Sequence, residues 1–321
     1  MGLTARLGFG TTTLMCYAVA IVILVSLPLY ASPAHIFLVG KALTMAIFAL
    51  GFNLILGYLG MVSFGHAAYY AVGAYTAALL ITRLSIKSIE IVLPASIAAS
   101  AVAAALIGFL CVRHTRIYFA LLTLAFGQMI YSVLMKEYSI TRGSEGIAGI
   151  SKPELFGLSL AVGNNYYYFI IVIFALSLLT LRVIVNSPFG KILQAIRENA
   201  ARTEFVGISI WKYRWIAFIL SGIFSGIGGA LFAPLTMHVS PELAYWTFSG
   251  EIVFITILGG HGLFEGPALG ALVFEFLKYF ALGQTIYWLI IVGSVLIFVV
   301  LVFPKGIAGT IVESVRRRLR K

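Results

Sequence analysis

The chain has 321 residues, of which 61% are hydrophobic and only 10% are charged, and its mean hydropathy is +1.04. Soluble domains contain about 45–50% apolar residues, so this composition excludes a soluble globular protein and predicts a polytopic membrane protein. Its 22 Lys and Arg residues outnumber its 11 Asp and Glu residues, but they lie beside apolar runs and at the C-terminus, which favours the lipid bilayer over nucleic acid as a partner.

Apolar runs follow one another along the chain, and many approach the roughly 20 residues that cross a bilayer. The first, 12–30, is as long as a span and follows a weakly basic start, so we interpret it as a span and not as a cleaved signal peptide. The other expected spans are 35–56, the run ending at 82, 89–112, 117–135, 166–185, 215–237, 250–261, 266–280 and 285–303. The sequence therefore predicts an all-α transmembrane bundle of eight to ten spans, in one membrane domain over 1–321.

Two glycine-rich stretches interrupt the apolar pattern. The first break, 57–66, contains Gly57, Gly60 and Gly65, and the second, 259–267, contains Gly259, Gly260, Gly262, Gly266 and Pro267. Irregular backbone at membrane depth is tolerated only where protein or a water-filled cavity satisfies its polar groups, and such places often form a substrate path. The alternative is tight turns with close helix packing.

Several polar residues are expected at membrane depth. Asn53, Ser63, His66, Thr123 and Gln128 are candidates to line a path between the two breaks, which we expect to face each other, although interhelical hydrogen bonds would explain them too. An ion-driven carrier would use ionisable groups there, and the candidates are Glu251, Glu275 and Lys278. Because Glu275 and Lys278 are three residues apart, we expect them to neutralise each other.

The longest polar run is 186–214. Asn186, Ser187 and Pro188 form a helix start, an apolar stripe from Phe189 to Val206 follows at three- and four-residue steps, and Gly207 is a plausible stop. This pattern predicts an amphipathic helix that rests on a membrane or in a groove, with its charges outward. The alternative is a basic loop that only fixes the topology.

The distribution of charge predicts the orientation. Ten crossings place both termini on one side, and the basic residues Arg113 and Arg116, the run 186–214 and the tail 304–321 all fall on that side, whereas the loop 136–165 has no net charge. By the positive-inside rule, the polar run and both termini are cytoplasmic.

The sequence contains no constellation for catalysis. It has no phosphate-binding loop of the GxxxxGK[ST] type and no HExxH, and Cys16 and Cys111 lie far apart. We expect no enzyme and no cofactor in this chain, so any ATP and Mg²⁺ belong to a partner.

Six blocks of the sequence resemble the permease subunits of branched-chain amino-acid ABC transporters, of the longer of the two permease types. They are GYLGMVSFGHAAYYAVGAYTAALL at 57–80, YFALLTLAFGQMIY at 118–131, TRGSEGIAGI at 141–150, FGKILQAIRENAARTEFVGI at 189–208, ILGGHGLFEGPALGA at 257–271 and FPKGIAGTI at 303–311. They occur in order over nearly the whole chain. Urea and short-amide permeases resemble the same pattern, so the solute is less specified than the family.

The resemblance implies an importer in the bacterial cytoplasmic membrane. Two similar permease subunits form its pore, two cytoplasmic ATP-binding subunits drive it, and an extracytoplasmic solute-binding protein delivers the solute. It also implies that 186–214 is the coupling loop, which places a short helix in a groove of the ATPase. Coupling loops of ABC importers carry a motif of the type Glu-Ala-Ala-x-x-x-Gly. At the Glu-Ala-Ala positions before Gly207, this chain has Ala201, Arg202 and Thr203. This departure weakens the match to the motif but leaves the arrangement of a helix followed by a glycine.

Within this loop we expect apolar anchors and charged residues with different roles. Phe189, Ile196 and Phe205 would anchor the helix, and Arg197, Glu198 and Arg202 would set its register through charges at the rim. Three other functions stay open: a channel or ion-coupled carrier working alone, a structural membrane subunit, and, last, an intramembrane enzyme.

Overall fold

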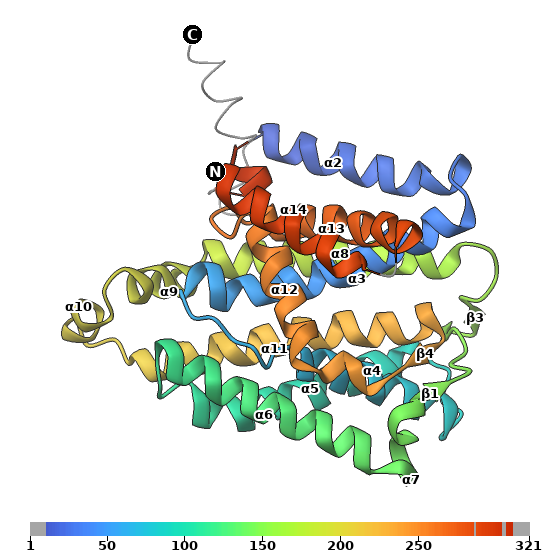
Figure 1. Cartoon of the computed structure of the whole chain (residues 1–321), viewed down its shortest axis with the longest axis horizontal. Helices are drawn as coiled ribbons and strands as arrows, with labels where there is room; N and C mark the ends of the chain where they lie inside the picture. Colours follow the sequence, from blue (N-terminus) through green and yellow to red (C-terminus); the bar gives the residue numbers. More distant parts are fainter. Residues whose placement is uncertain (1–10, 286, 304–305, 311–321) are drawn as a thin grey trace.

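The chain is almost entirely helical in its computed structural model, which describes residues 11–285, 287–303 and 306–310 (Figure 1). The strands in this part of the chain are only two residues long. Arg6 and most of the basic tail 304–321 lie outside the described residues. The all-α fold predicted from the composition is confirmed.

Ten apolar helices account for the predicted runs. Six are long and apolar enough to cross a membrane: α3 with the π-turn that follows it (Pro33–Tyr58), α5 (Ile89–Cys111), α6 (Arg116–Lys136), α8 (Asn165–Asn186), α11 (Ile210–Thr236) and α13 (Gly266–Gln284). Four are shorter: α2 (Thr11–Ser26, followed by the turn Leu27–Leu29), α4 (Ala67–Thr82), α12 (Trp246–Gly259) and α14 (Trp288–Val302). The runs 250–261 and 266–280 are therefore separate helices, α12 and α13, around a break, as expected.

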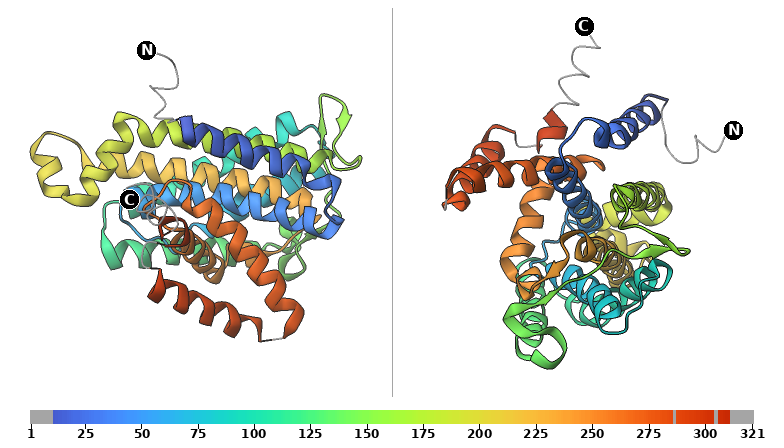
Figure 2. Two further views of the ribbon diagram at one scale, coloured as in Figure 1. Left: turned by 90° about the horizontal axis from the view of Figure 1, so that it is seen from above. Right: turned by 90° about the vertical axis from the view of Figure 1, so that its right-hand side faces the viewer.

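Helix α11 lies at the centre of the bundle and packs against α3, α4 and α5 (Figures 1 and 2). Its glycines make this close packing feasible. A Cβ on Gly226 would collide with Ser100 of α5, and one on Gly229 would collide with the carbonyl of Tyr70 in α4. These glycines give α11 a face on which neighbouring helices approach to backbone distance.

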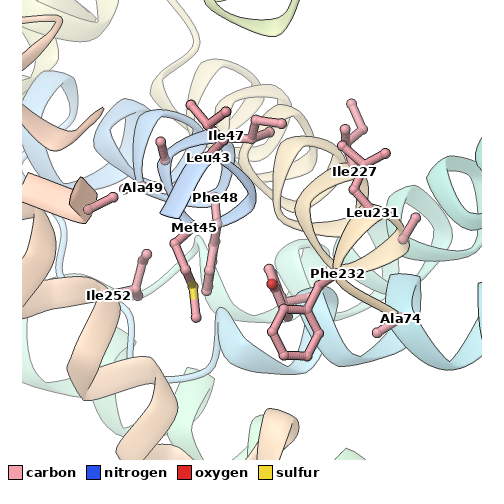
Figure 3. Packing of buried hydrophobic residues seen from close by; sticks show 14 of the residues in the cluster. Leu43, Met45, Ile47, Phe48, Ala49, Ala74, Ile227, Leu231, Phe232 and Ile252 are labelled. Carbon is pink, nitrogen blue, oxygen red and sulfur yellow. The ribbon is translucent and has the colours of Figure 1, made fainter. Parts of the chain in front are cut away.

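The main apolar cluster joins α3 to α11, α4 and α12. Figure 3 shows Phe48 of α3 between Phe232 of α11 on one side and Ile252 of α12 on the other. Because lipid tails are as apolar as these side chains, dispersion contacts in this dense packing, and not the hydrophobic effect, hold the helices together inside a membrane.

The bundle has two distinct ends. We call the end with α9 (Pro188–Glu198) and α10 (Ala200–Phe205) the α9 end, and the end with α7 (Tyr138–Thr141) the α7 end; they lie on opposite sides of Figure 1. At the α7 end, β1 (Ile147–Ala148) pairs with β4 (His238–Val239), and β2 (Glu154–Leu155) pairs with β3 (Leu158–Ser159), both antiparallel. The turns Gly143–Glu145 and Pro241–Ala244 complete this end.

The single helix predicted after Pro188 is wrong, because the chain forms two helices there. Asn199 leaves the helical conformation at φ −156° and ψ 97° and accepts a hydrogen bond from the backbone N–H of Arg202 at 2.9 Å. An Asn side chain in this position caps a new helix. The periodic apolar pattern continues across the break, which is why it did not reveal the cap.

The expected pair between Glu275 and Lys278 is also wrong. Glu275 accepts from Lys41 of α3 at 2.9 Å, and Lys278 donates to both carboxylate oxygens of Glu251 of α12 at 2.8 and 2.9 Å. Helix α13 packs against both α3 and α12, so each charged residue finds its partner on a neighbouring helix.

Candidate functional site

The first break is an irregular segment held by α6. Helix α3 ends in a π-turn, Leu54–Tyr58, and α4 begins only at Ala67. The backbone N–H of Phe64 donates to Thr123 at 3.3 Å, and Gly65 lies so close to α6 that a Cβ would collide with the carbonyl of Thr123. A π-turn inside a helix is frequent at functional sites, and here it directs the chain back into the bundle.

His66 and Ser63 are enclosed within the protein. The imidazole Nδ1 of His66 lies 2.7 Å from the hydroxyl of Ser63, and its ring stands at 4.9–5.3 Å from the rings of Phe52, Tyr69 and Phe218. Both side chains have no exposed surface. In this conformation they stabilise the break, and a role in lining a path stays a proposal.

Two further polar candidates have side-chain atoms without a hydrogen-bond partner among the described residues. Both amide atoms of the buried Asn53 lack one, and so does the Nε2 atom of Gln128, which is half-buried on α6. Burying an amide without a partner costs roughly 1–3 kcal/mol. The bundle therefore retains polar groups at membrane depth that its own packing does not satisfy.

The first turns of two short helices meet inside the bundle. The backbone N–H of Ala67, at the start of α4, donates to the hydroxyl of the buried Ser249, in the first turn of α12, at 3.0 Å. Tyr245, just before α12, packs against Tyr131 of α6 with ring centroids 4.9 Å apart. Ser249 was missed from the sequence, where a hydroxyl in the first turn after a helix start would have been the signal.

The second break joins α12 to α13. Gly260 has a φ of 104°, which favours glycine, and a Cβ on Gly259 would collide with the carbonyl of Gly266. Pro267 lies in the first turn of α13, where its missing N–H costs nothing. Just before it, Glu265 pairs with Arg182 of α8 at 2.5 Å and accepts a hydrogen bond from Tyr17 of α2.

The two breaks lie against each other at the α9 end, where Arg197 of α9 contacts the first of them. A Cβ on Gly57 would stand 2.6 Å from the carbonyl oxygen of His261. The guanidinium of Arg197 donates to the carbonyl of Gly57, and its Cγ lies 2.9 Å from the place of a Cβ on Gly60, whose φ is 73°. Burial and then the charge of Arg197 lower the pKa of His261.

The residues of the expected coupling loop, 186–214, divide into an inner and an outer set. Ile196 is 3% exposed and Leu193 is buried within the bundle's own packing, and Phe189 stacks on Tyr213 at 5.7 Å. We therefore correct the expectation that Ile196 faces a partner: it fixes α9 to the bundle. Glu198 and Arg202 are exposed.

The tip of the loop is apolar and open. Phe205 is 91% exposed and Val206 is 77% exposed, just before Gly207, whose φ of 85° ends α10. Figure 1 shows α10 projecting beyond the rest of the bundle. Two adjacent large apolar side chains at such exposure are a marker of an interaction site.

Comparison with known proteins identifies the family. Residues 34–300 match the family model described as branched-chain amino acid transport system / permease component. The chain is 28% identical over 310 residues to LivM of Salmonella typhimurium, a high-affinity branched-chain amino acid transport system permease protein, with 89% of this chain and 73% of LivM covered. Identity to LivM of Escherichia coli K12 is also 28%, over 315 residues, covering 91% of this chain and 74% of LivM.

The chain is also similar to the second permease type. LivH of Escherichia coli K12 is 25% identical over 289 residues, with 83% of this chain and 91% of LivH covered. No solved structure matches the chain.

Proposed function

The chain belongs to the family of branched-chain amino acid transport permeases and corresponds to the longer of the two permease types, and from this premise we propose that it is the transmembrane subunit of an ATP-driven importer. Its role as a permease follows from the family. The energy source, the partners and the solute are the proposal.

The observation that carries the proposal is the arrangement of α9 and α10. The tip with Phe205 and Val206 is open to a partner, while Arg197, in the last turn of α9, contacts the first break. An apolar tip of this kind fits a hydrophobic groove on an ATP-binding subunit. A movement of that subunit would then be transmitted to the two breaks through α9. Leu193 and Ile196 are buried and fix α9 to the bundle.

The proposed assembly contains this chain, a second homologous permease, two cytoplasmic ATP-binding subunits that hold ATP and Mg²⁺, and an extracytoplasmic solute-binding protein. The similarity of the chain to both LivM and LivH supports the pairing of two related permeases. We place the assembly in the bacterial cytoplasmic membrane with the α9 end in the cytoplasm, since that end gathers basic residues such as Arg113, Arg116 and Lys191. One membrane domain spans 1–321 in this proposal, with both termini cytoplasmic.

The proposed path runs past the facing first turns of α4 and α12. Among the described residues, Gln128 and Asn53 have polar atoms without a hydrogen-bond partner, and Ser63, His66 and Thr123 hold the break in place. The cargo we propose is a branched-chain amino acid. A urea or amide permease of the same family and a channel or carrier that works without ATP are the competing functions.

Co-purification tests the proposal. The chain is expressed with its neighbouring open reading frames and purified in mild detergent, and we expect an ATP-binding chain to co-elute with the wild type and with Phe205→Leu, but not with Phe205→Asp. Leucine in place of phenylalanine keeps the tip apolar and serves as the matched control. If the ATP-binding chain stays bound to Phe205→Asp, or never co-elutes, the loop is only a topology signal.

A further inference from the structure

Two ion pairs lie inside the apolar part of the bundle, and they differ in how exposed the carboxylate is. We call Lys41 and Glu275 the closed pair, because the side chain of Glu275 is 1% exposed, whereas that of Lys41 is 24% exposed. Lys278 and Glu251 form an open pair, since their side chains are 17% and 20% exposed. A charged residue within a membrane segment is costly and is a functional candidate by default, so the open pair calls for an explanation that packing alone does not supply.

The open pair lies on a continuous face of α12. Thr247, Glu251 and Phe254 follow each other at steps of four and three residues, so they share one side of the helix. Thr247 and Phe254 are exposed. Across from them, the ammonium of Lys278 stands 4.9 Å from the ring centroid of Trp288, in the first turn of α14. The pair thus lies between α12, α13 and the start of α14.

An apolar pocket adjoins this face. It has a volume of about 380 Å³ and is lined by Phe254 of α12 and by Gly293, Leu296, Ile297 and Leu301 of α14. Phe254 belongs both to the pocket and to the face that carries Glu251. Phe254 therefore connects the face that carries Glu251 to this apolar pocket, whose lining includes the exposed Ile297 and Leu301.

We propose that the Glu251–Lys278 pair is a binding subsite for a zwitterionic amino acid with a branched aliphatic side chain. The incoming solute brings the same two charges as the pair. When the pair opens, Glu251 accepts hydrogen bonds from the α-ammonium group and Lys278 donates to the α-carboxylate, so no charge is left without a partner. The side chain of the solute occupies the pocket beside Phe254.

This subsite deepens the proposed import function and rests on it, because it assigns residues of this chain to the recognition of the proposed solute. A neutral solute such as urea or a short amide offers no charges that would open the pair. Glu251 and Lys278 would then have no role in recognition, and the pair would serve only as a link between α12 and α13.

The first test neutralises each pair in turn. The purified assembly is reconstituted in proteoliposomes with its solute-binding protein, and labelled leucine uptake and ATP hydrolysis are measured together. We expect the double variant Glu251→Gln/Lys278→Met to retain assembly and ATP hydrolysis and to lower the leucine transported per ATP about ten- to a hundredfold, the worth of charge-assisted hydrogen bonds. The reversed pair Glu251→Lys/Lys278→Glu should restore part of the transport.

The closed pair provides the matched control. Lys41→Met/Glu275→Gln makes the same chemical change in the same membrane region, and we expect its leucine-to-ATP ratio to stay near that of the wild type. The inference is overturned if the open-pair variant transports leucine normally, or if assembly, hydrolysis and uptake fall together in both variants. A wild-type assembly without ATP-dependent uptake would instead refute the proposed import function itself.

The second test fills the pocket without touching the charges. A Cβ on Gly293 would meet no atom within 4 Å, and the same holds for Gly283, which lies outside the pocket on α13. We expect Gly293→Leu to lower leucine uptake at unchanged ATP hydrolysis and Gly283→Leu to leave both unchanged. Equal effects of the two substitutions would show that a lipid chain or nothing occupies the pocket.

Discussion

Arg197 donates a hydrogen bond to the carbonyl of Gly57, a residue 140 positions earlier in the chain. This contact joins α9 to the end of α3, and Gly57 in turn lies against the carbonyl of His261 in the second break. One side chain of the coupling loop thus reaches the place where both interrupted helices meet, which is where a movement of the loop would change the bundle.

Replacing Arg197 should separate association from transport. Arg197→Gln shortens the donor and leaves the carbonyl of Gly57 unsatisfied, a loss of about 1–3 kcal/mol, while the tip at Phe205 is unchanged. We expect the ATP-binding chain to co-elute normally and ATP-driven uptake to fall at least about tenfold. Lys191→Gln, which removes another exposed charge of α9, is the control. Loss of co-elution in Arg197→Gln would place Arg197 in the partner interface instead.

The glycines of the two breaks should differ sharply in how well they tolerate substitution by alanine. Gly57→Ala places a methyl group against the side chain of Asn53 and the carbonyl of His261, whereas a Cβ on Gly262 meets nothing within 4 Å. We expect Gly57→Ala to cost about 1–3 kcal/mol and to lower the thermal midpoint in detergent, and Gly262→Ala to leave it unchanged. Equal midpoints for both variants would contradict the close approach of the two breaks.

The inner and outer sides of the coupling loop should respond to different assays. Ile196→Ala removes buried packing and should destabilise the chain by about 2–5 kcal/mol. Phe205→Ala removes an exposed side chain and should change stability by less than about 0.5 kcal/mol while weakening association with the ATP-binding chain. Denaturation in detergent and co-elution measure the two effects, and the assignment fails if Phe205→Ala proves the more destabilising change.

His261 should make stability depend on pH in the acidic range. Its pKa is lowered in the folded chain, so the unfolded chain binds the proton more readily, and stability falls as the pH drops below about 6.5, the ordinary value for histidine. We expect wild type and His261→Asn to diverge below that pH and to run parallel above it. Thermal midpoints in detergent between pH 5 and 8 measure this. Parallel curves throughout would show that burial and Arg197 do not act on His261.

Cysteine labelling should place the two ends of the bundle on opposite sides of the membrane. With Cys16 and Cys111 replaced, Gly262→Cys lies at the α9 end and Val162→Cys at the α7 end, and both native positions are exposed. A membrane-impermeant maleimide added to intact cells should label only position 162. Labelling of position 262 from outside would reverse the orientation or show that α12 and α13 form a re-entrant segment.

The helices could be predicted from the sequence because apolar length and glycine punctuation are local signals. The breaks at Gly57 and Gly259 followed from the same reasoning. The ion pairs could not be predicted in this way. Glu275 and Lys278 are close in sequence, but each pairs with a residue on another helix, α3 or α12, and no pattern along one helix indicates which neighbour will provide the partner.

The coupling loop shows the same limit. Its apolar periodicity is continuous, so the cap at Asn199 was hidden and Ile196 looked like an exposed anchor. The burial of Ile196 and the contact of Arg197 with Gly57 depend on where distant segments pack. The exposure of Phe205 agrees with the role expected from the sequence, whereas the pocket beside Phe254 follows from tertiary structure alone.

Leucine accumulation in proteoliposomes that contain the complete assembly tests the central claim most directly. With the solute-binding protein on the α7 side, we predict uptake against a gradient when ATP is supplied on the α9 side, and none with ADP. Leucine passing through this chain alone, without ATP or partner subunits, would contradict the account and identify a channel or ion-coupled carrier.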